Sequence, residues 1–395
     1  MRKHFSIQVS VLVVLILCIG IKSVHAQASS LNQSLDTLFK NRIAEKEMAG
    51  AVCLISHKGS IIYNRSFGYR NIEKKLPMQA GTYFRMRSML KPIITLAILK
   101  LVQEGRISLD DPATKYFPEL NDKKVGVKKD SAIEYVAAIR PITLRHLLSH
   151  SSGLGSFWNA GALRSIYIKY DSTAFPSFKD SIEAYMRLPL IDQPGDKWHY
   201  GLGHLIMAYL IEKVSGISYK EFLKNEIFLP LKMNNTTFQL PKGKENELAQ
   251  YYSLTMGQLK KTLKDSAYTG GDDLMSTAED YYKFCTLLMN NGKLNGKAFI
   301  RSNLMKEFIT PVVGLNAEEI PWHKGYAFAL GVSVRINEDN ADFKGSLGDF
   351  GWIGLFNTAF WIDPKKQLTG IVLSQTYYNM YQLSKAVKNV VYTFF

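Results

Sequence analysis

The amino-acid sequence predicts an α+β protein in which one antiparallel sheet, flanked by helices, is completed by both ends of the chain and carries an all-helical insertion. Two observations predict this architecture. Strand-like runs occur within residues 51–67 and again within 327–374, whereas the middle of the chain, roughly 109–270, is rich in helical patterns and poor in strands. In addition, 46% of the 395 residues are hydrophobic and 21% are charged, which supplies a large core and excludes disorder as the main state.

A signal peptide is predicted over residues 1–26. A basic start at Arg2 and Lys3 precedes the apolar stretch Val9–Ile21, which is too short to span a bilayer comfortably, and a small-residue cleavage site follows at Ala26. We therefore expect an exported protein, periplasmic or secreted, with no stable membrane insertion once the signal is removed.

The rest of the chain is expected to form two domains with the active site between them. The strand-like runs assign residues 27–108 and 271–395 to one discontinuous α/β sheet domain. Residues 109–270 are expected to form a mostly helical domain.

The elements near the N-terminus follow from hydrophobic spacing and turn residues. Apolar residues three and four positions apart predict helices, and short apolar runs around a Gly-containing turn predict a hairpin. The expected elements are a helix over 31–46, a hairpin of strands 51–56 and 61–67 around the turn 57–60, and a helix over 88–104 that Gly105 ends.

The same patterns predict the helices and strands of the middle and of the C-terminal part. Gly216 is placed to end one helix, and Ser276 with Glu279 forms a capping box that begins another. The expected helices cover 143–150, 202–215, 276–290 and 379–392, and the expected strands cover 327–336, 356–362 and 368–374, the last two joined by the tight turn 363–366.

Charge and cysteine content exclude some classes of function. The formal net charge is +15, and it becomes +12 without the signal peptide, which carries three basic residues and no acidic one. These charges are scattered rather than gathered in a stripe, which together with export argues against nucleic-acid binding. Cys53 and Cys285 both lie on apolar faces 232 positions apart, which favours two buried thiols over a disulfide.

Ser88 and Lys91 form the one Ser-x-x-Lys sequence of the chain, at the start of a predicted helix. Three residues along a helix place the amine on the same face as the hydroxyl, where it can take the hydroxyl proton. The helix N-terminus also stabilises negative charge at the serine. On this motif alone, a helix-capping serine followed by a surface lysine remains the alternative.

The surrounding sequence resembles the serine β-lactamase and penicillin-binding-protein superfamily. The matching segments appear in the family's order over nearly all of the mature chain and include FRMRSMLKPIITLAILKL, ITLRHLLSHSSGL, PGDKWHYGLGHLI, GGDDLMSTAEDYYKF and FGWIGLFNTAFWIDP. Within the superfamily, the sequence is most similar to class C β-lactamase-like proteins and family VIII carboxylesterases. The resemblance implies a β-lactamase/transpeptidase-like fold, Ser88 as the nucleophile, and no cofactor.

Tyr200 matches the tyrosine of the family's Tyr-x-Asn motif. The resemblance implies that its phenol, held as tyrosinate by cationic Lys91, acts as a general base. A core aromatic residue beside Trp198 is the alternative for Tyr200. The third motif position is Leu202 instead of Asn, which removes an amide that positions the lysine and the substrate in β-lactamases.

The family's third motif, Lys-Thr-Gly or His-x-Gly, aligns with Trp352-Ile353-Gly354. Relatives with a cation there bind the substrate carboxylate, whereas an indole offers one N–H donor and apolar surface. Gly354 lets the substrate approach the strand edge, and the Leu355 N–H is expected to form an oxyanion hole with the Ser88 N–H. Strand packing is the alternative role of Trp352.

Two other classes of hydrolase are excluded because the sequence lacks their motifs. No serine has the Gly-x-Ser-x-Gly setting of an α/β-hydrolase. His146 and His150 are four apart but lack the further ligands of a zinc hydrolase, so we expect them to order the turn before Ser151, and no metal is expected. Asp272 and Asp273 are interpreted as loop acids.

The sequence therefore predicts an exported serine hydrolase that acts through an acyl-enzyme on a small-molecule ester or amide, with carboxylic esters favoured. One alternative is a β-lactamase or D-Ala-D-Ala peptidase that acts on cell-wall-type substrates. Another is a non-catalytic protein that keeps the cleft only to bind an envelope ligand, which the departures at Leu202 and Trp352 would suit. The sequence indicates no particular protein partner.

Overall fold

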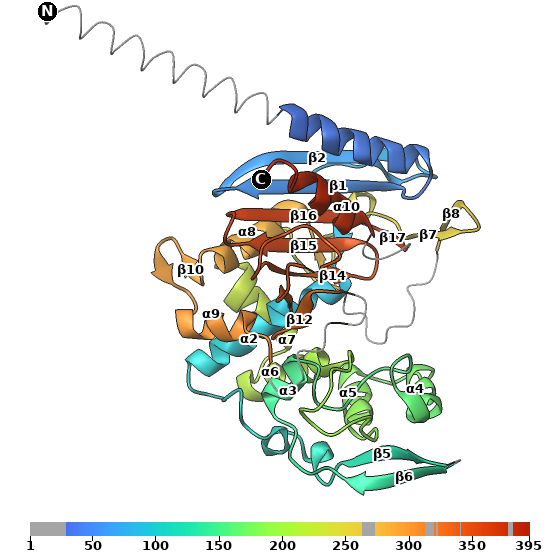
Figure 1. The fold of residues 1–395 in the computed structure, drawn as a ribbon, viewed down its shortest axis with the longest axis vertical. Coiled ribbons are helices and arrows are strands. Elements are labelled where there is room, and N and C mark those ends of the chain that lie inside the picture. The colour runs from blue at the N-terminus through green and yellow to red at the C-terminus, as the bar shows by residue number, and fades with distance from the viewer. Residues whose placement is uncertain are drawn as a thin grey trace, which may run out of the picture.

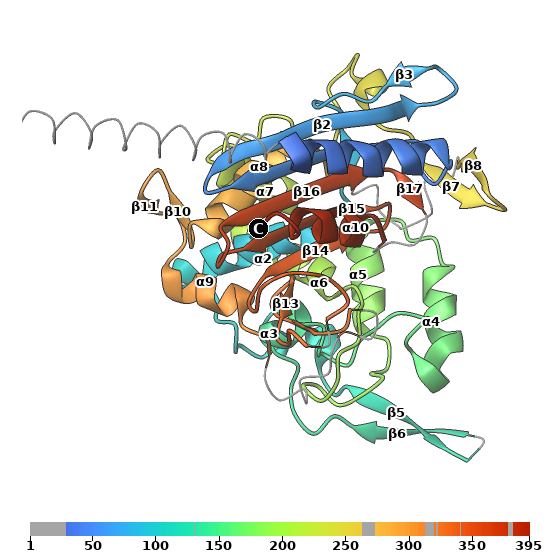
Figure 2. The same cartoon turned by 45° about the horizontal axis from the view of Figure 1, so that its top comes forward.

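A computed structural model describes residues 29–130, 132–262, 273–312, 320, 323–339, 341–377 and 382–395 (Figure 1). The predicted signal peptide and Asp272 lie outside these residues. The N-terminal helix and the C-terminal helix cover one face of a central sheet, and a larger helical body covers the other face. The β5–β6 hairpin projects from the far end of that body (Figures 1 and 2).

The central sheet has eight strands, all paired antiparallel, in the order β12-β13-β14-β15-β16-β1-β2-β3. Its N-terminal strands are β1 (Gly50–His57), β2 (Ser60–Asn71) and β3 (Leu76–Pro77). Its C-terminal strands are β12 (Tyr326–Phe328), β13 (Ser333–Arg335), β14 (Phe350–Gly354), β15 (Thr358–Asp363) and β16 (Leu368–Ser374). Because β1 pairs with β16 along its length, from Ala51 opposite Ser374 to His57 opposite Leu368, both ends of the chain complete one sheet, as predicted.

Alternate residues of β1 serve two separate cores, because successive side chains of a strand point to opposite faces. Cys53 and Ile55 pack with the N-terminal helix over 29–44 and with α10 (Gln382–Val391). Val52 and Leu54 join the larger core, which holds α2 (Leu90–Gln103) and α8 (Ala278–Met289). Both faces of the sheet are therefore covered.

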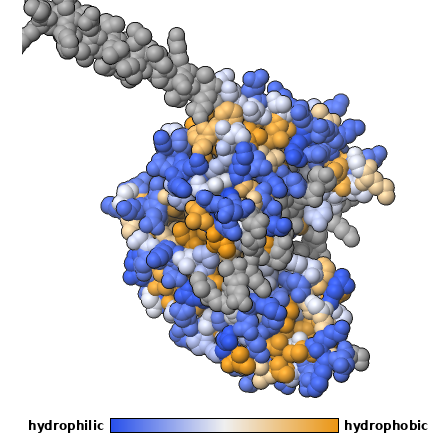
Figure 3. Space-filling model, in the orientation of Figure 1, coloured by the Kyte–Doolittle hydropathy of each residue, from blue (hydrophilic) through white to orange (hydrophobic). Residues whose placement is uncertain are grey.

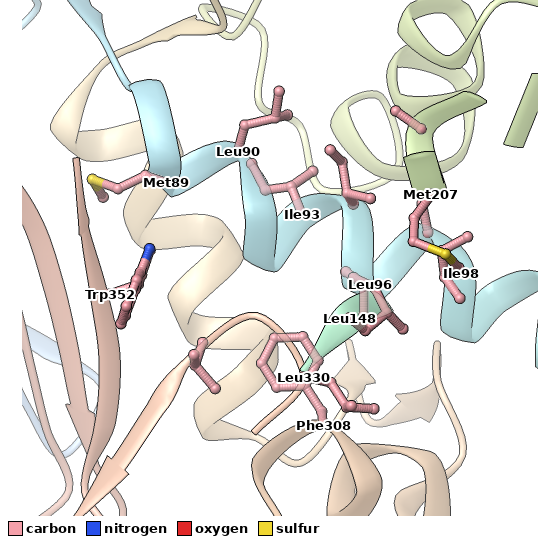
Figure 4. Close-up of a cluster of buried hydrophobic side chains, with 14 of the residues drawn as sticks. Met89, Leu90, Ile93, Leu96, Ile98, Leu148, Met207, Phe308, Leu330 and Trp352 are labelled. Atoms are coloured by element: carbon pink, nitrogen blue, oxygen red, sulfur yellow. The ribbon is translucent and has the colours of Figure 1, made fainter. Parts of the chain in front are cut away.

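Helix α2 is almost entirely buried, because its sequence is apolar on every side. It follows a single 3₁₀ turn, η1 (Arg87–Met89), and ends before Gly105, whose φ of 72° is the left-handed conformation that glycine adopts without strain. Figure 4 shows the residues of α2 packed between those of the sheet domain and those of the middle segment. The labelled side chains are Met89, Leu90, Ile93, Leu96, Ile98, Leu148, Met207, Phe308, Leu330 and Trp352.

The middle of the chain is not made of helices alone, so that part of the sequence prediction is wrong. It contains the hairpin of β5 (Lys124–Lys129) and β6 (Ala132–Ala137), and the pair β7 (Tyr252–Thr255) and β8 (Gln258–Lys261), which β17 (Thr376–Tyr377) joins. Lysine makes up half of β5 (KVGVKK) and half of β8 (QLKK), so neither has the apolar run that marks a strand in sequence. Its helices are α3 (Leu144–Leu148), α4 (Arg164–Asp171), α5 (Phe178–Met186), α6 (Gly203–Ser215) and α7 (Tyr219–Leu223).

Two predicted boundaries are also corrected. The single strand expected over 327–336 is divided into β12 and β13 around Gly331, where a Cβ atom would lie 2.6 Å from Thr95 Oγ1. The cap of α8 is Thr277, which accepts a hydrogen bond from the Asp280 N–H, whereas Ser276 lies in the short strand β9 (Met275–Ser276). Helix α8 is therefore capped by Thr277, the residue directly after the predicted cap Ser276.

The surface in Figure 3 is mostly hydrophilic, with apolar side chains in separate patches. Exposed apolar residues of and beside the β5–β6 hairpin include Val127, Tyr135, Val136 and Ile139. No helix among the described residues is long and apolar enough to cross a membrane. Cys53 and Cys285 are both buried free thiols.

A buried ion pair joins α10 to the edge of β14. The Asp349 carboxylate accepts hydrogen bonds from Lys388 Nζ at 2.8 Å and from the Tyr326 hydroxyl at 2.9 Å, and both charged side chains are 5% exposed or less. Asp349 directly precedes the strand that carries Trp352, so this pair fixes the helix against the strand next to the site described below.

We expect Asp349→Ala to lower the free energy of unfolding by about 3–5 kcal/mol, because it leaves the Lys388 ammonium buried without its counterion. Urea unfolding at neutral pH measures the change. Tyr326→Phe is the matched control, since it leaves the ion pair and removes only the hydroxyl that bonds the carboxylate and Lys388 Nζ, at a cost of about 1.5–3 kcal/mol. Equal losses in the two variants would contradict the prediction.

Candidate active site

Ser88 lies in the turn η1, which neighbouring segments hold on both sides. The Met86 N–H donates to the Leu274 carbonyl at 2.8 Å, and the Tyr281 hydroxyl of α8 donates to the Met89 carbonyl at 2.8 Å. Arg87 has a φ of 49°, a conformation that costs energy in a residue other than glycine and clusters at functional sites. The backbone around Ser88 is thus held in a strained turn.

The three residues predicted to be catalytic meet at one point. Lys91 Nζ donates a hydrogen bond to Ser88 Oγ at 3.2 Å, and the Tyr200 hydroxyl donates to the same oxygen at 2.7 Å. Lys91 Nζ also lies 4.8 Å from the centroid of the Tyr200 ring. All three side chains are half-buried. A serine hydroxyl between a phenol and an ammonium has two groups within reach that can exchange its proton.

Tyr200 is fixed by its own backbone. Ser156 Oγ and Asn159 Nδ2 each donate to the Tyr200 carbonyl at 3.0 Å. The next residue, Gly201, has no room for a side chain, because a Cβ atom would lie 2.4 Å from the Tyr185 hydroxyl. Leu202 then forms the N-cap of α6 and donates its N–H to that hydroxyl at 3.1 Å. Leu202 therefore lies close to Tyr200 and has a partly buried apolar side chain.

Two buried histidines lie behind Tyr200 and Lys91. The His150 ring centroid is 4.6 Å from that of Tyr200, and His150 Nδ1 accepts the Gly201 N–H at 3.4 Å. His204 Nε2 lies 3.3 Å from Thr95 Oγ1, which itself donates to the Lys91 carbonyl. Burial, together with the positive charge of Lys91, holds the pKa of both rings well below the usual range. Both are therefore neutral and add no positive charge near Lys91.

The sequence analysis did not place His150 or His204 at the site. Its interpretation of His146 as a local ordering residue fits the contacts, since His146 Nδ1 accepts the Thr143 N–H in the capping box of α3. Within the described residues, no group of three or more His, Cys, Asp or Glu side chains could hold a metal ion.

Tryptophan side chains surround the Tyr200 ring. The ring centroids of Trp158, Trp198 and Trp352 lie 5.9, 5.9 and 5.8 Å from its own. Trp352 is 4% exposed and also packs edge-on against Phe328, at 4.9 Å. Its indole nitrogen faces the start of α2 in Figure 4 and has no hydrogen-bond partner among the residues that the structure describes. Trp352 thus combines core packing with a contact to the Tyr200 ring.

The end of β14 packs against the turn that carries Ser88. A Cβ atom on Gly354 would lie 2.5 Å from the Met86 carbonyl oxygen, so only glycine permits this approach. Leu355 follows directly. Among the described residues, neither the Ser88 N–H nor the Leu355 N–H donates a backbone hydrogen bond outside the helices and strands.

Arg87, the residue before Ser88, contacts a second group of side chains. Its Nη1 lies 2.8 Å from Asp273, and its guanidinium lies 5.5 Å from the ring centroids of Tyr251 and Phe356. Asp273 is therefore the partner of an arginine next to Ser88, a contact that its position in a Gly-rich loop did not reveal.

Comparisons with known proteins agree with this geometry. A family model described as "Beta-lactamase" matches residues 35–389. Esterase EstB from Burkholderia gladioli is 24% identical over 92% of this chain and 96% of its own length, and lovastatin esterase from Penicillium rubens is 28% identical over 85% and 91%. The solved structure of EstCE1, a hydrolase with promiscuous acyltransferase activity, superposes with a TM-score of 0.79, at 23% identity over 92% of this chain and 99% of that one. This likeness confirms the predicted fold class.

Proposed function

The chain belongs to the β-lactamase family of serine hydrolases, and from that premise we propose that it cleaves neutral carboxylic esters through an acyl-enzyme on Ser88. The observation that carries the proposal is that Ser88 Oγ accepts hydrogen bonds from both Tyr200 and Lys91. The two relatives described above that are named esterases support this class of substrate.

In the proposed mechanism, one member of the Tyr200 and Lys91 pair is deprotonated at the start, and Ser88 Oγ attacks the ester carbonyl carbon while its proton passes to that base. The carbonyl oxygen becomes an oxyanion that the Ser88 and Leu355 N–H groups stabilise. The bond from carbon to the alcohol oxygen then breaks, and Tyr200 returns the proton to the departing alcohol. Water repeats the sequence in the second half-reaction and releases the acid and free Ser88.

The proposed preference for neutral esters rests on Trp352 and Leu202. β-Lactams and cell-wall peptides carry a carboxylate beside the scissile carbonyl, and a cation that met it would contribute about 1.5–3 kcal/mol. Trp352 instead places a buried indole against Tyr200, and Leu202 places an apolar side chain where an amide would bind the substrate. Any β-lactamase activity is therefore expected to be residual.

We expect the wild type to show a higher kcat/KM for p-nitrophenyl butyrate than for nitrocefin. Trp352→Lys is expected to shift the ratio of the two values toward nitrocefin by about tenfold or more, because it supplies a cation for the carboxylate. Trp352→Phe is the matched control and should keep the wild-type preference. Faster turnover of nitrocefin than of the ester by the wild type, or no shift in Trp352→Lys, would contradict this prediction.

Intact-mass analysis tests the proposed mechanism directly. The purified protein is incubated with a fluorophosphonate probe and, separately, with short-chain esters, β-lactams and D-Ala-D-Ala peptides. We expect one covalent adduct with the probe, located on Ser88 by peptide mapping, and an acyl adduct that accumulates with esters. An unlabelled Ser88 would overturn the mechanism, and an adduct that forms with β-lactams or peptides alone would replace the proposed substrate class.

Export and the division into domains are part of the same proposal. Ser88 and Lys91 come from the segment 27–108, Tyr200 from 109–270 and Leu355 from 271–395, so the site would lie where the proposed domains meet. The proposed signal peptide is tested by N-terminal sequencing of protein recovered from the periplasm or medium, which should begin near Gln27. Recovery from the cytoplasm alone, with Met1 intact, would contradict export.

A further inference from the structure

Trp158 is an exposed aromatic side chain beside the proposed reacting atoms. Its ring centroid lies 5.9 Å from that of Tyr200, whose hydroxyl is 2.7 Å from Ser88 Oγ. It is 45% exposed, whereas Trp352 on the same tyrosine is 4% exposed. An indole that is left open to solvent next to a nucleophile presents a flat apolar surface to whatever binds there.

The position of Trp158 is fixed, although its side chain is exposed. Ser156 and Asn159, on either side of it in sequence, both bind the Tyr200 carbonyl, and the Ser156 N–H donates to Asn159 Oδ1 at 2.7 Å. The Gly155 carbonyl accepts a hydrogen bond from the buried Tyr185 hydroxyl. Two hydrogen bonds thus tie the short loop to the Tyr200 backbone, one lies within the loop, and one joins the loop to α5.

The proposed role of Tyr200 as the proton donor to the leaving alcohol indicates which part of a substrate can contact Trp158. If Tyr200 returns the proton to the departing alcohol, the alcohol oxygen lies within hydrogen-bond reach of its hydroxyl. The group attached to that oxygen then extends past the Tyr200 ring, whereas the carbonyl oxygen points toward the Leu355 N–H. The alcohol part of the ester is therefore the part that can reach the indole.

We propose that Trp158 binds the alcohol part of the ester and makes the enzyme selective for flat, apolar alcohols such as benzyl or larger aryl-methyl alcohols. This inference rests on the proposed esterase function and extends it to a substrate class. Stacking of an aromatic alcohol on the indole buries apolar surface on both partners, which an ethyl ester cannot do to the same extent.

The test compares three esters that separate the two sides of the scissile bond. Benzyl butyrate and ethyl butyrate share the acyl group and have leaving alcohols of similar basicity, while ethyl phenylacetate carries its aromatic ring on the acyl side. Trp158→Ala, Trp158→Phe and the wild type are assayed with each. Tyr135→Ala is the matched control, because Tyr135 is an aromatic residue of the same exposure, 45%, on the β5–β6 hairpin.

We expect Trp158→Ala to lower kcat/KM about tenfold for benzyl butyrate and less than about twofold for ethyl butyrate and ethyl phenylacetate. Trp158→Phe should restore most of the loss, and Tyr135→Ala should change none of the three values. An equal loss for all three esters would show a structural role and overturn the inference, as would a loss confined to ethyl phenylacetate. Fluorophosphonate labelling of Ser88 is measured in parallel, so that failure of the proposed esterase mechanism is recognised separately.

A second measurement does not depend on the fraction of folded enzyme. When an alcohol replaces water in the second half-reaction, its oxygen bonds to the acyl carbon, the bond from that carbon to Ser88 Oγ breaks, and the alcohol proton passes through Tyr200 to Oγ. The ratio of butyrate ester to free butyrate, measured with benzyl alcohol and with ethanol, then reports alcohol binding alone. We expect benzyl alcohol to be favoured by the wild type and this preference to fall about tenfold in Trp158→Ala; an unchanged ratio would overturn the inference.

Discussion

Replacement of Ser88 by alanine is expected to lower kcat/KM for p-nitrophenyl butyrate by about 10⁴-fold or more and to abolish labelling by a fluorophosphonate. The reason is that the acyl group has no other acceptor at the point where Lys91 and Tyr200 converge. The side chain lost is small and half-buried, so the melting temperature should change little. Ester hydrolysis, probe labelling and thermal unfolding are measured on the same preparation.

Lys91 and Tyr200 are expected to act with Ser88 as one unit. Lys91→Met and Tyr200→Phe should each lower kcat/KM by about 10²- to 10⁴-fold, the usual contribution of a positioned acid or base. In the Ser88→Ala background, either change should add almost nothing, because residues that serve the same step are not additive. Ser60→Ala, at an exposed serine that begins β2, is the control and should keep full activity. Activity within tenfold of wild type in Ser88→Ala would remove Ser88 as the nucleophile.

The second large effect concerns stability at acidic pH. Burial holds the pKa of His150, His204 and His323 well below the ordinary 6.5, and that of His146 at about 4. In the unfolded chain these rings take up protons as the pH falls below about 6.5, while in the folded protein they stay neutral. The unfolded state then binds more protons, so folding stability is fully present above pH 6.5 and is lost as the pH falls.

Each such histidine lowers the free energy of unfolding by about 1.4 kcal/mol per pH unit between its unfolded and its folded pKa. His150, His204 and His323 together should contribute a slope of about 4 kcal/mol per unit below pH 6.5, and His146 should add about 1.4 kcal/mol per unit down to its own pKa of about 4. Urea unfolding at half-unit steps from pH 8 to pH 5 measures this slope. His323→Phe keeps an aromatic ring against Tyr326 and should reduce the slope by the contribution of one histidine, about 1.4 kcal/mol per pH unit. A flat profile from pH 6.5 to pH 5 would contradict the prediction.

Much of the fold could be predicted because local signals agreed with the tertiary structure. The β1–β2 hairpin has an apolar run on each side of a glycine turn, and α6 ends at Gly216, which has the left-handed φ of 81°. By contrast, β14 is only five residues long and contains two glycines, so nothing in its own sequence marks it as a strand. Its place in the sheet comes from pairing with β13 and β15.

Some residues of the candidate site could likewise be predicted from the sequence, and others could not. Ser88, Lys91 and Tyr200 could be found in the sequence because short motifs place them, and the resemblance to a family links those motifs. His150 and Trp158 could not, because their roles depend on contacts with Tyr200, which lies 50 and 42 positions further along the chain. Asp273 was assigned to a loop for the same reason, since its arginine partner precedes it by 186 positions. Contacts between residues so far apart in the chain leave no pattern in the sequence around either residue.

The pairing of β1 with β16 has a consequence for the order in which the chain can fold. During synthesis from the N-terminus, β1 is made first, yet the strand that covers its open edge ends at Ser374, close to the last residue. The β1–β2 hairpin therefore has one edge and two apolar faces uncovered until residues 72–374 have been synthesised. A chain that stops short of β16 would expose a long apolar strand edge to its neighbours, so shortened translation products should aggregate instead of forming a smaller active enzyme.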